Sequence, residues 1–315
     1  MSVLAFYPQP SALHLAVGRQ GKFKTAARAL TTTPEQLVKQ QIIPWLSGEN
    51  LLHSIQFVVT SAYLPQIGES GLYRLTPPLP PVTMGIGPVL AGLTARELKV
   101  EAYLVDPTTP RECCPQALIT GAPEFPRKCC GDGFIFKYLS RLEGGDRLIA
   151  AHLSETVQIG ALSHGRLLDL SSSSHEGAFA LQQAGGLPFD SVLDLCEKVG
   201  NRQKLLDKIN LSGGFRGYLG DVGFSSSTAV EEEQIWQAFS YQVAKEIGAC
   251  AAVLEGRFDA ILLAGRLLKN GVFTAALKKR IGFLGTLAFY PEDQGLQALL
   301  AGAERIVAGE AILNY

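Results

Sequence analysis

The segment from Ala238 to Phe273 constrains the fold more than any other part of the chain, because helix and buried strand alternate within it. A stretch with helical periodicity leads into the apolar sequence FDAILLAG at 258–265, and a second helical stretch follows. This alternation predicts an α/β fold. In such folds, a strand–glycine–helix junction is where backbone N–H groups can meet a nucleotide. Here the bulky Arg266 and Leu267 follow Gly265, where a nucleotide loop needs small residues.

The chain of 315 residues is long enough for two domains, and the same order of elements occurs twice along it. Each half opens with predicted strands in meander order and then alternates helix with strand. Thr33 is predicted to cap a helix that starts at Pro34, and the proline- and glycine-rich residues 64–88 are predicted to be loop. The predicted strands are 3–6, 13–17, 22–29, 55–60, 101–105, 148–152, 158–162, 166–170, 215–219, 260–263 and 287–289. The predicted helices are 34–45, 89–98, 134–142, 189–199, 203–209, 231–254 and 295–308. We therefore expect a duplicated α/β unit with a ligand cleft between the halves.

The composition excludes several classes of partner. The net charge is −1, so neither a nucleic-acid face nor a polybasic membrane patch is expected. Only 18% of the residues are charged and 47% are apolar, which favours a homo-oligomer that buries part of the apolar surface. No apolar run approaches the roughly 20 residues of a membrane span. The N-terminus lacks the basic start of a signal peptide, so a cytoplasmic protein is expected.

Two pairs of adjacent cysteines, Cys113-Cys114 and Cys129-Cys130, are unusual. Four thiolates could bind zinc or an iron–sulfur cluster. The side chains of adjacent cysteines point in different directions, however, and the spacing fits no C-x-x-C ligand pair. We therefore expect reduced thiols without a metal, and the role of the two pairs stays open.

Several longer stretches resemble a known family. The sequences SYQVAKEIGA, FDAILLAG and AFYPEDQGLQALLAGAERIVAGE resemble the C-terminal part of butyrate kinase, a member of the acetokinase branch of the sugar kinase–Hsp70–actin superfamily. The resemblance continues upstream through AGGLPFDSVLDLC, HGRLLDL, DRLIAAHL, TGAPEFPRK and AYLVDP, and it is strong from about residue 100 onward. It implies two RNase H-like domains with a cleft between them. The first would span 1–145, completed by the C-terminal helix 295–315, and the second would span 146–294.

The resemblance also implies a reaction. Family members transfer a phosphoryl group from ATP, held with magnesium in the cleft, to a short fatty carboxylate. Such a transfer depends on positioning and on neutralising phosphate charge, so it needs glycine or hydroxyl loops, arginines and magnesium-binding carboxylates.

The first phosphate loop of the family, Asn-Pro-Gly-Ser-Thr-Ser-Thr-Lys, corresponds to residues 7–14, YPQPSALH. Pro8 and Ser11 are compatible with it, which makes Ser11 a positional candidate for cofactor binding. The glycine and the lysine are absent, and Pro10 lacks a backbone N–H that could face phosphate. The alternative interpretation is a tight turn between two strands.

The second phosphate loop of the family, His-Leu-Gly-Gly-Gly, corresponds to 152–156, HLSET. His152 stands where the family keeps a histidine near the transferred phosphoryl group, so it is a catalytic candidate; a core histidine is the alternative. Ser154 is a positional candidate for cofactor binding. Glu155 would repel a triphosphate by roughly 1–4 kcal/mol per charge pair at surface-like dielectric.

The arginines that the family uses are missing. No arginine stands at Thr60–Ala62, where a Gly-Arg-Gly-Gly stretch is expected, and Gln183 replaces the arginine of a Glu-Arg-Ala-Gly-Gly stretch, although Gly185 and Gly186 remain as candidates. Losing one such charge donor commonly costs about 10²–10³ in rate. A histidine–asparagine pair expected near Thr83–Gly87 is also absent.

A few residues of the pattern survive. Asp106 and Asp169 could each hold a metal-bound water, although an aspartate that ends a strand is more often a cap or turn former. The adenosine-side glycine pair is reduced to Ala264-Gly265, and Gly220-Asp221 stands where the family has Gly-Thr-Asn-Asp.

Two functional hypotheses follow. The first is a pseudokinase that keeps the fold, has lost phosphoryl transfer and serves a binding or regulatory role, with a protein partner in acyl metabolism and no certain cofactor. The alternative is an active short-chain carboxylate kinase that uses Mg-ATP, in which a cation from a new position, Arg266 above all, replaces the missing arginines. An unrelated ligand is the third possibility.

Overall fold

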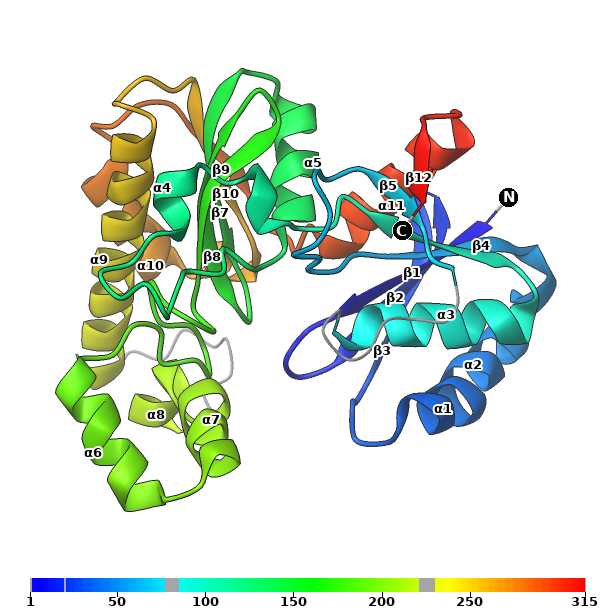
Figure 1. Cartoon of the computed structure of the whole chain (residues 1–315), viewed down its shortest axis with the longest axis horizontal. Helices are drawn as coiled ribbons and strands as arrows, with labels where there is room; N and C mark the ends of the chain where they lie inside the picture. Colours follow the sequence, from blue (N-terminus) through cyan, green and yellow to red (C-terminus); the bar gives the residue numbers. More distant parts are fainter. Residues whose placement is uncertain (1, 20, 77–84, 221–229, 315) are drawn as a thin grey trace. The chain divides into compact units, whose positions relative to one another are not determined.

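The computed structural model describes residues 2–19, 21–76, 85–220 and 230–314. The chain divides into two compact units (Figure 1). Unit 1 comprises Met1–Cys113, Asp132–Leu139 and Gln294–Tyr315, and unit 2 comprises Cys114–Gly131 and Ser140–Asp293. The predicted domain boundaries at 145 and 294 stay a prediction.

Unit 1 is built on a sheet of seven strands in the order β12-β5-β6-β4-β1-β2-β3. Its first three strands form the predicted antiparallel meander, and β4 and β6 extend the sheet in parallel with β1. The strands at the centre of this sheet are covered on both faces, so their residues are buried, which agrees with their apolar runs. The strands are β1 (Ser2–Pro8), β2 (Leu13–Arg19), β3 (Lys22–Arg28), β4 (Ile55–Thr60), β5 (Leu72–Arg74), β6 (Glu101–Val105) and β12 (Ile312–Asn314).

The helices of unit 1 begin where the capping signals predict. Thr33 forms a capping box with Gln36 ahead of Pro34, as its position before a proline indicates. The helical segment that follows consists of α1 (Pro34–Leu37), a π-helical turn (Val38–Ile42) and α2 (Ile43–Gly48). Two more helices, α3 (Ile86–Leu98) and α11 (Gly295–Val307), pack on the sheet. α5 (Gly133–Glu143) starts in unit 1 and ends in unit 2, and α4 (Pro115–Leu118) lies in unit 2.

Unit 2 repeats the arrangement with five strands in the order β11-β10-β7-β8-β9. β7, β8 and β9 form the second antiparallel meander, while β10 and β11 run parallel to β7. The strands are β7 (Arg147–Leu153), β8 (Val157–Ser163), β9 (Arg166–Ser172), β10 (Ala260–Ala264) and β11 (Leu287–Tyr290). The helices are α6 (Phe189–Val199), α7 (Arg202–Leu211), α8 (Gly214–Leu219), α9 (Val230–Val253) and α10 (Gly271–Ile281).

The core of unit 2 lies between this sheet and the pair α9 and α10. The buried faces of the two helices meet in an aromatic cluster that includes Trp236, Phe239 and Phe273. Phe215 from α8 joins this cluster, its ring centre 4.4 Å from that of Trp236. The predicted apolar stripe Ile235, Phe239, Val243 and Ile247 is the face of α9 that packs against this core.

Some predicted elements are wrong. Residues 215–219 form α8 rather than a strand: a short apolar run fits either structure, and Gly214, at φ +56°, starts a helical turn there. The region 64–88 contains the short strand β5, and α3 already begins at Ile86. Residues 77–84 and Asp221, on which the loop and motif predictions also depend, lie outside the described residues.

Candidate functional site

The carboxyl ends of three parallel strands meet at one edge of the unit 2 sheet. Ala264 in β10 lies opposite His152 in β7 and Tyr290 in β11, so the residues that follow these strands come together. Ligands of open α/β sheets bind at this kind of edge. It therefore brings the predicted loop 152–156 next to the predicted Gly265–Arg266 junction.

A tight turn follows β7. The backbone N–H of Ser154 donates to the carbonyl of Thr156 at 3.1 Å, and the buried Ser154 hydroxyl donates to Asp293 Oδ2 at 2.8 Å. Asp293 comes from the segment after β11, so this hydrogen bond links the ends of the two strands. The Ser154 hydroxyl, a candidate for cofactor binding, is thus used within the protein.

Glu155 and Arg266 form an ion pair at the same edge. Arg266 Nη2 donates to Glu155 Oε1 at 3.0 Å, and 31% of the arginine side chain and 12% of the glutamate side chain are exposed. The predicted acid is therefore present but neutralised, because the arginine that follows Gly265 lies against it. The sequence does not reveal this pairing, since the two residues are 111 positions apart.

Gly265 is required by packing at this junction. A Cβ atom there would lie 2.2 Å from the carbonyl oxygen of Leu153, and the φ of +116° disfavours any other residue. The N–H of Gly265 donates to the carbonyl of Tyr290 at 3.0 Å, and Leu267 is fully buried in the unit 2 core. Gly265 thus lets the ends of β7 and β10 lie close together, its N–H binds the end of β11, and Leu267 packs in the core.

His152 is fully buried at the end of β7. Neither of its ring nitrogens has a hydrogen-bond partner among the described residues, and Nε2 lies 3.6 Å from Asp293 Oδ2. An unpaired buried imidazole is unusual and marks a place where a water molecule or a ligand group would be bound. His152 is therefore a predicted site residue of unit 2 whose two ring nitrogens have no hydrogen-bond partner within the described part of the chain.

In unit 1, the predicted acid Asp106 is buried and held by an arginine. Arg305 of α11 donates from Nη1 to Asp106 Oδ2 at 2.7 Å, and the same guanidinium binds Glu310. The hydrogen bonds to Glu310, and the charge of Asp106, raise the pKa of Arg305 above its usual range. Asp106 takes φ +43° and its N–H donates to the carbonyl of Gly71 at 2.8 Å. This aspartate therefore fastens the end of β6 to α11.

The first phosphate-loop region of the sequence is a turn between two antiparallel strands. Gln9 N–H donates to the carbonyl of Ala12 at 2.9 Å, and Ser11 lies exposed between β1 and β2. Thr60, in the stretch where an arginine is missing, donates its hydroxyl to the carbonyl of Phe6 at 2.9 Å and is fully buried.

The chain is similar in sequence to butyrate kinases, although it matches no established protein-family profile. It is 31% identical to butyrate kinase 1 of Clostridium acetobutylicum over 241 residues, which cover 71% of this chain and 68% of that protein. Butyrate kinase 2 of the same organism is 30% identical over the same shares of both chains. This chain belongs to the butyrate kinase family.

Solved structures of the wider acetokinase family share its fold. Acetate kinase from Entamoeba histolytica superposes with a TM-score of 0.73 over 96% of this chain and 99% of that one, at 16% identity. A propionate kinase from Francisella tularensis gives a TM-score of 0.72 at 12% identity, over 95% of this chain and 98% of that one. The predicted fold of two acetokinase-type α/β domains is confirmed.

This butyrate kinase homologue differs from the family's phosphate-binding pattern in how its polar groups are used. Gln183, at a position where the resemblance predicts an arginine, is buried and accepts a hydrogen bond from the Ser173 hydroxyl. Gly186 N–H donates to the carbonyl of Gly177 at 3.0 Å, and a Cβ on Gly185 would lie 2.6 Å from that same oxygen. The retained glycine pair therefore packs two loop segments together.

Membership of a kinase family implies Mg-ATP as the cosubstrate of an active member. The described residues of the loop after β7 do not fit a triphosphate: the loop contains a carboxylate, the nearby guanidinium already binds that carboxylate, and the Gly265 N–H is bound to Tyr290. No step of a phosphoryl transfer can be derived from this donor set.

Sequence reasoning missed a charged cluster of unit 2 around Arg127. Arg127 binds both oxygens of Glu176 through Nε at 3.0 Å and donates from Nη1 to Asp169 at 2.9 Å. The hydrogen bonds to Glu176 raise the pKa of Arg127 above its usual range. The carboxylate of Asp169, a candidate for holding a metal-bound water, is thus already paired with Arg127. The PRK sequence alone carries no signal of these partners.

All six cysteines are free thiols, and Cys130 Sγ lies 3.5 Å from His175 Nδ1. Burial raises the pKa of Cys130 to about 11. Within the described residues, no group of three or more His, Cys, Asp or Glu side chains could hold a metal ion. None of the helices among those residues is both long and apolar enough to cross a membrane.

Proposed function

We propose that this butyrate kinase homologue is a pseudokinase: it keeps the acetokinase fold, has lost phosphoryl transfer and serves as a binding or regulatory protein. The observation that carries the proposal is the Glu155–Arg266 ion pair at the carboxyl edge of β7 and β10. A triphosphate would have to displace the arginine from its partner and then lie against a carboxylate, two opposing electrostatic costs.

The other family positions support the same conclusion. Gln183 offers a neutral amide bound to Ser173 where a cation is needed, and Asp106 is already occupied by Arg305. The first change removes, and the second engages within the protein, a charged group of the kind on which the transfer of a phosphoryl group depends. A role without catalysis calls for a partner, and family membership points to a protein of acyl metabolism; that step is an analogy at the level of the fold.

The proposal is tested by trapping acyl phosphate with hydroxylamine in the presence of Mg-ATP and each straight-chain acid from acetate to hexanoate. We expect no hydroxamate above the blank. Mg-ATP should also leave the unfolding temperature of the protein unchanged, whereas an active kinase at 100 times its dissociation constant would gain about 2.7 kcal/mol.

A double variant, Glu155→Gly with Thr156→Gly, sharpens the test. It restores two of the three glycines of the family loop and releases Arg266, so Mg-ATP should now raise the unfolding temperature. Glu292→Gln is the matched control, because it removes an acid from the same edge where Glu292 pairs with Lys269 at 2.7 Å. A shift in the wild type equal to that of the double variant would contradict the proposal.

The alternative, an active short-chain carboxylate kinase, is favoured by one observation. His152 stands at the family's histidine position with both ring nitrogens lacking a hydrogen-bond partner among the described residues. In that case the wild type would form butyryl hydroxamate, and His152→Ala would abolish it.

A further inference from the structure

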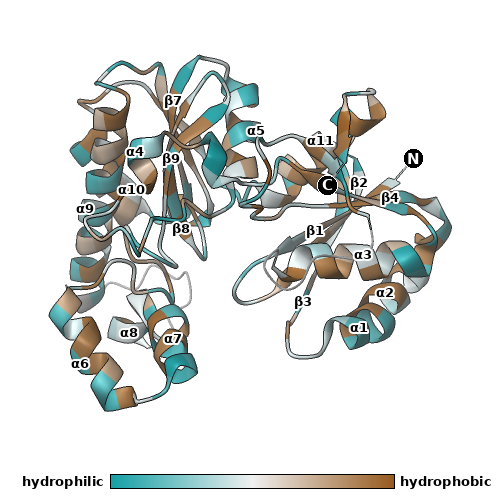
Figure 2. Cartoon of the chain, in the orientation of Figure 1, coloured by the Kyte–Doolittle hydropathy of each residue, from teal (hydrophilic) through white to brown (hydrophobic). Residues whose placement is uncertain are grey.

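The end of α3 forms one wall of a pocket in unit 1. The helix is mostly apolar up to Leu93 and carries the basic Arg96 in its last turn (Figure 2). Lys99 then takes the left-handed conformation at φ +55°, and the N–H groups of Lys99 and Val100 donate to the carbonyls of Arg96 and Ala95. This Schellman cap turns the chain back, so that Val100 lines the same pocket as Ala95.

The floor of this pocket is apolar. Its volume is about 620 Å³, which lies within the range of pockets that hold small molecules. Apolar residues of α3, of β6 and of the segments beside them line it: Leu75, Leu93, Ala95, Val100 and Ala102. Leu75, Ala95 and Ala102 are buried in the core of unit 1, so the floor rests on well-packed structure. We call this feature the α3–β6 pocket.

Two arginines and one acid stand at the rim of the α3–β6 pocket. Arg74 Nη1 lies 3.4 Å from Glu101 Oε1, and the Tyr103 hydroxyl also donates to Glu101. Arg96 is exposed and has no hydrogen bond or ion pair with any residue that the structure describes. Among the described lining residues, one positive charge is therefore left without a counter-charge.

The α3–β6 pocket is separate from the candidate site of unit 1. Arg74 pairs with Tyr103 in the antiparallel ladder of β5 and β6, and Glu101 is the first residue of β6. The pocket thus lies at the amino end of β6, whereas Asp106 follows its carboxyl end. Five residues of strand put roughly 16 Å between these ends, so a small ligand in the pocket does not reach Asp106.

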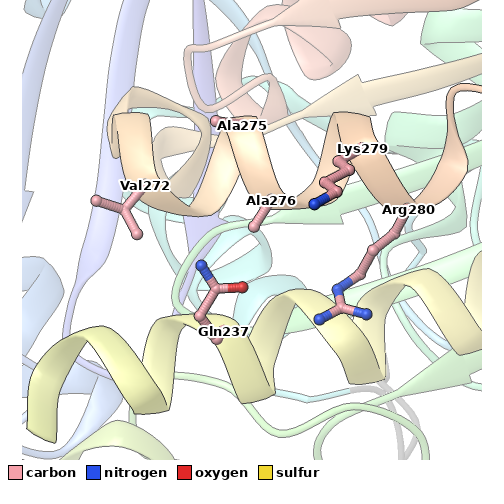
Figure 3. A pocket seen from close by; sticks show the side chains of 6 residues that line it. All are labelled: Gln237, Val272, Ala275, Ala276, Lys279 and Arg280. Carbon is pink, nitrogen blue, oxygen red and sulfur yellow. The ribbon is translucent and has the colours of Figure 1, made fainter.

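A groove between α9 and α10 in unit 2 is a contrasting case (Figure 3). Its volume is similar, about 590 Å³, and Lys279 and Arg280 give it two cations. Arg280 points toward α9 in Figure 3, and its guanidinium lies 5.3 Å from the centre of the Tyr241 ring. The apolar lining consists of Val272 and two alanines, which offer little surface to an aliphatic chain. The α3–β6 pocket is therefore the better match for a ligand with an apolar body.

We propose that the α3–β6 pocket binds a small amphipathic monocarboxylate with an aliphatic chain of roughly six to ten carbons. The chain lies on the apolar floor, where its affinity grows with the apolar area removed from water. The carboxylate faces Arg96, which favours an anionic head group over a neutral one. Glu101 opposes a second negative charge, so a monocarboxylate fits better than a dicarboxylate or a phosphate ester. The cap on the carbonyls of α3 reduces the repulsion that this helix end exerts on an anion.

Titration of the full-length protein with sodium octanoate, followed by ligand-observed NMR without nucleotide, tests the proposal independently of phosphoryl transfer. We expect saturable binding with a dissociation constant of about 1 mM or tighter. Octanol, which has the same chain without the charge, and butyrate, which has four fewer methylenes, should each bind at least about threefold more weakly. No saturable binding of octanoate, or equal binding of octanol, would overturn the proposal.

Charge variants at the rim should change octanoate affinity in opposite directions. Arg96→Gln should weaken binding by about threefold or more, because it removes the counter-charge of the carboxylate. Glu101→Gln should tighten binding by about twofold to fivefold, because it removes a repelling charge and frees Arg74. A merely structural role of the two side chains would not produce effects of opposite sign.

Lys279→Gln is the matched control for these variants, because it removes a positive charge from the groove between α9 and α10 instead. It should leave octanoate binding unchanged. Equal effects of Arg96→Gln and Lys279→Gln, or a loss of affinity in Glu101→Gln, would contradict the assignment to the α3–β6 pocket.

Photolabelling locates the ligand without any substitution. An octanoate analogue with a diazirine at the end of its chain should, on irradiation, label peptides that contain residues 72–76 or 93–102. An excess of octanoate should suppress this labelling. Labelling confined to other segments, such as 152–156, would place the carboxylate elsewhere and overturn the proposal.

Discussion

The two units each hold a carboxylate just after a strand, paired with an arginine from a distant segment, but the two pairs differ in origin and burial. In unit 1, Asp106 survives from the family pattern, its side chain is 3% exposed, and Arg305 of α11 covers it. In unit 2, Glu155 stands where the family resemblance predicts a glycine, and its partner Arg266 stands where a nucleotide-binding junction would need a small residue.

The difference shows two ways in which a charged residue at the end of a strand is held by an ion pair within the protein. At Asp106, a residue that could serve a ligand acts as the fastener of β6 to α11. At Glu155, a carboxylate that would repel a nucleotide is neutralised inside the protein by Arg266. We therefore expect the first pair to contribute mainly to stability and the second mainly to excluding a ligand, and three measurements separate these roles.

The largest effect is expected from Arg305→Met, which leaves the Asp106 carboxylate buried without its partner. Removing one member of a buried ion pair typically costs about 3–5 kcal/mol in the free energy of unfolding. Chemical denaturation measures this cost. The double variant Asp106→Asn/Arg305→Met should recover most of it, and Lys24→Ala, which removes an exposed pair with Glu49, should change little. Equal losses for Arg305→Met and Lys24→Ala would show that the burial of Asp106 is unimportant.

A smaller effect is expected at the second pair. Arg266→Met should cost about 1–2 kcal/mol, because it strands a mostly buried carboxylate, whereas Glu155→Gln should cost less, because its arginine can reach solvent. A double-mutant cycle of the two substitutions, followed by denaturation, measures the coupling free energy. A coupling free energy of zero would show that the ion pair does not stabilise the loop after β7.

The smallest effect is the dependence of the two couplings on salt. Raising sodium chloride to about 1 M shortens the screening length to roughly 3 Å, which weakens exposed pairs more than buried ones. The Glu155–Arg266 coupling should therefore fall by a larger fraction than the Asp106–Arg305 coupling. The same two cycles repeated at low and high salt measure both, and a reversed order would contradict the difference in burial.

Much of the fold is predictable from local patterns. The apolar runs of β4, β7 and β10 were long and uninterrupted, Thr33-Pro34 fixed a helix start, and the repeated meander indicated a duplicated unit. The short strands β5 and β12 were not predicted, since three residues carry too little pattern. Residues 215–219 were misassigned because Phe215 is buried by tertiary contact with Trp236, which an apolar run cannot distinguish from a strand.

The candidate site was less predictable, and the reason is physical. Sequence comparison identified which residue types had changed at His152–Thr156 and at Gly265–Arg266, but it assigned Glu155 a repulsive charge without a partner. Charge balance depends on which side chains converge in space. Arg127 shows the same limit, because its partners Asp169 and Glu176 lie more than 40 residues away.

Gly265 carries a consequence for how relatives of this chain are classified. Its place is dictated by the closeness of two strand ends, where even a methyl group would collide with the Leu153 carbonyl. A steric demand of this kind persists whether or not adenosine is ever bound. Scoring a glycine at this junction as a sign of kinase activity would therefore mistake a steric requirement for a catalytic one.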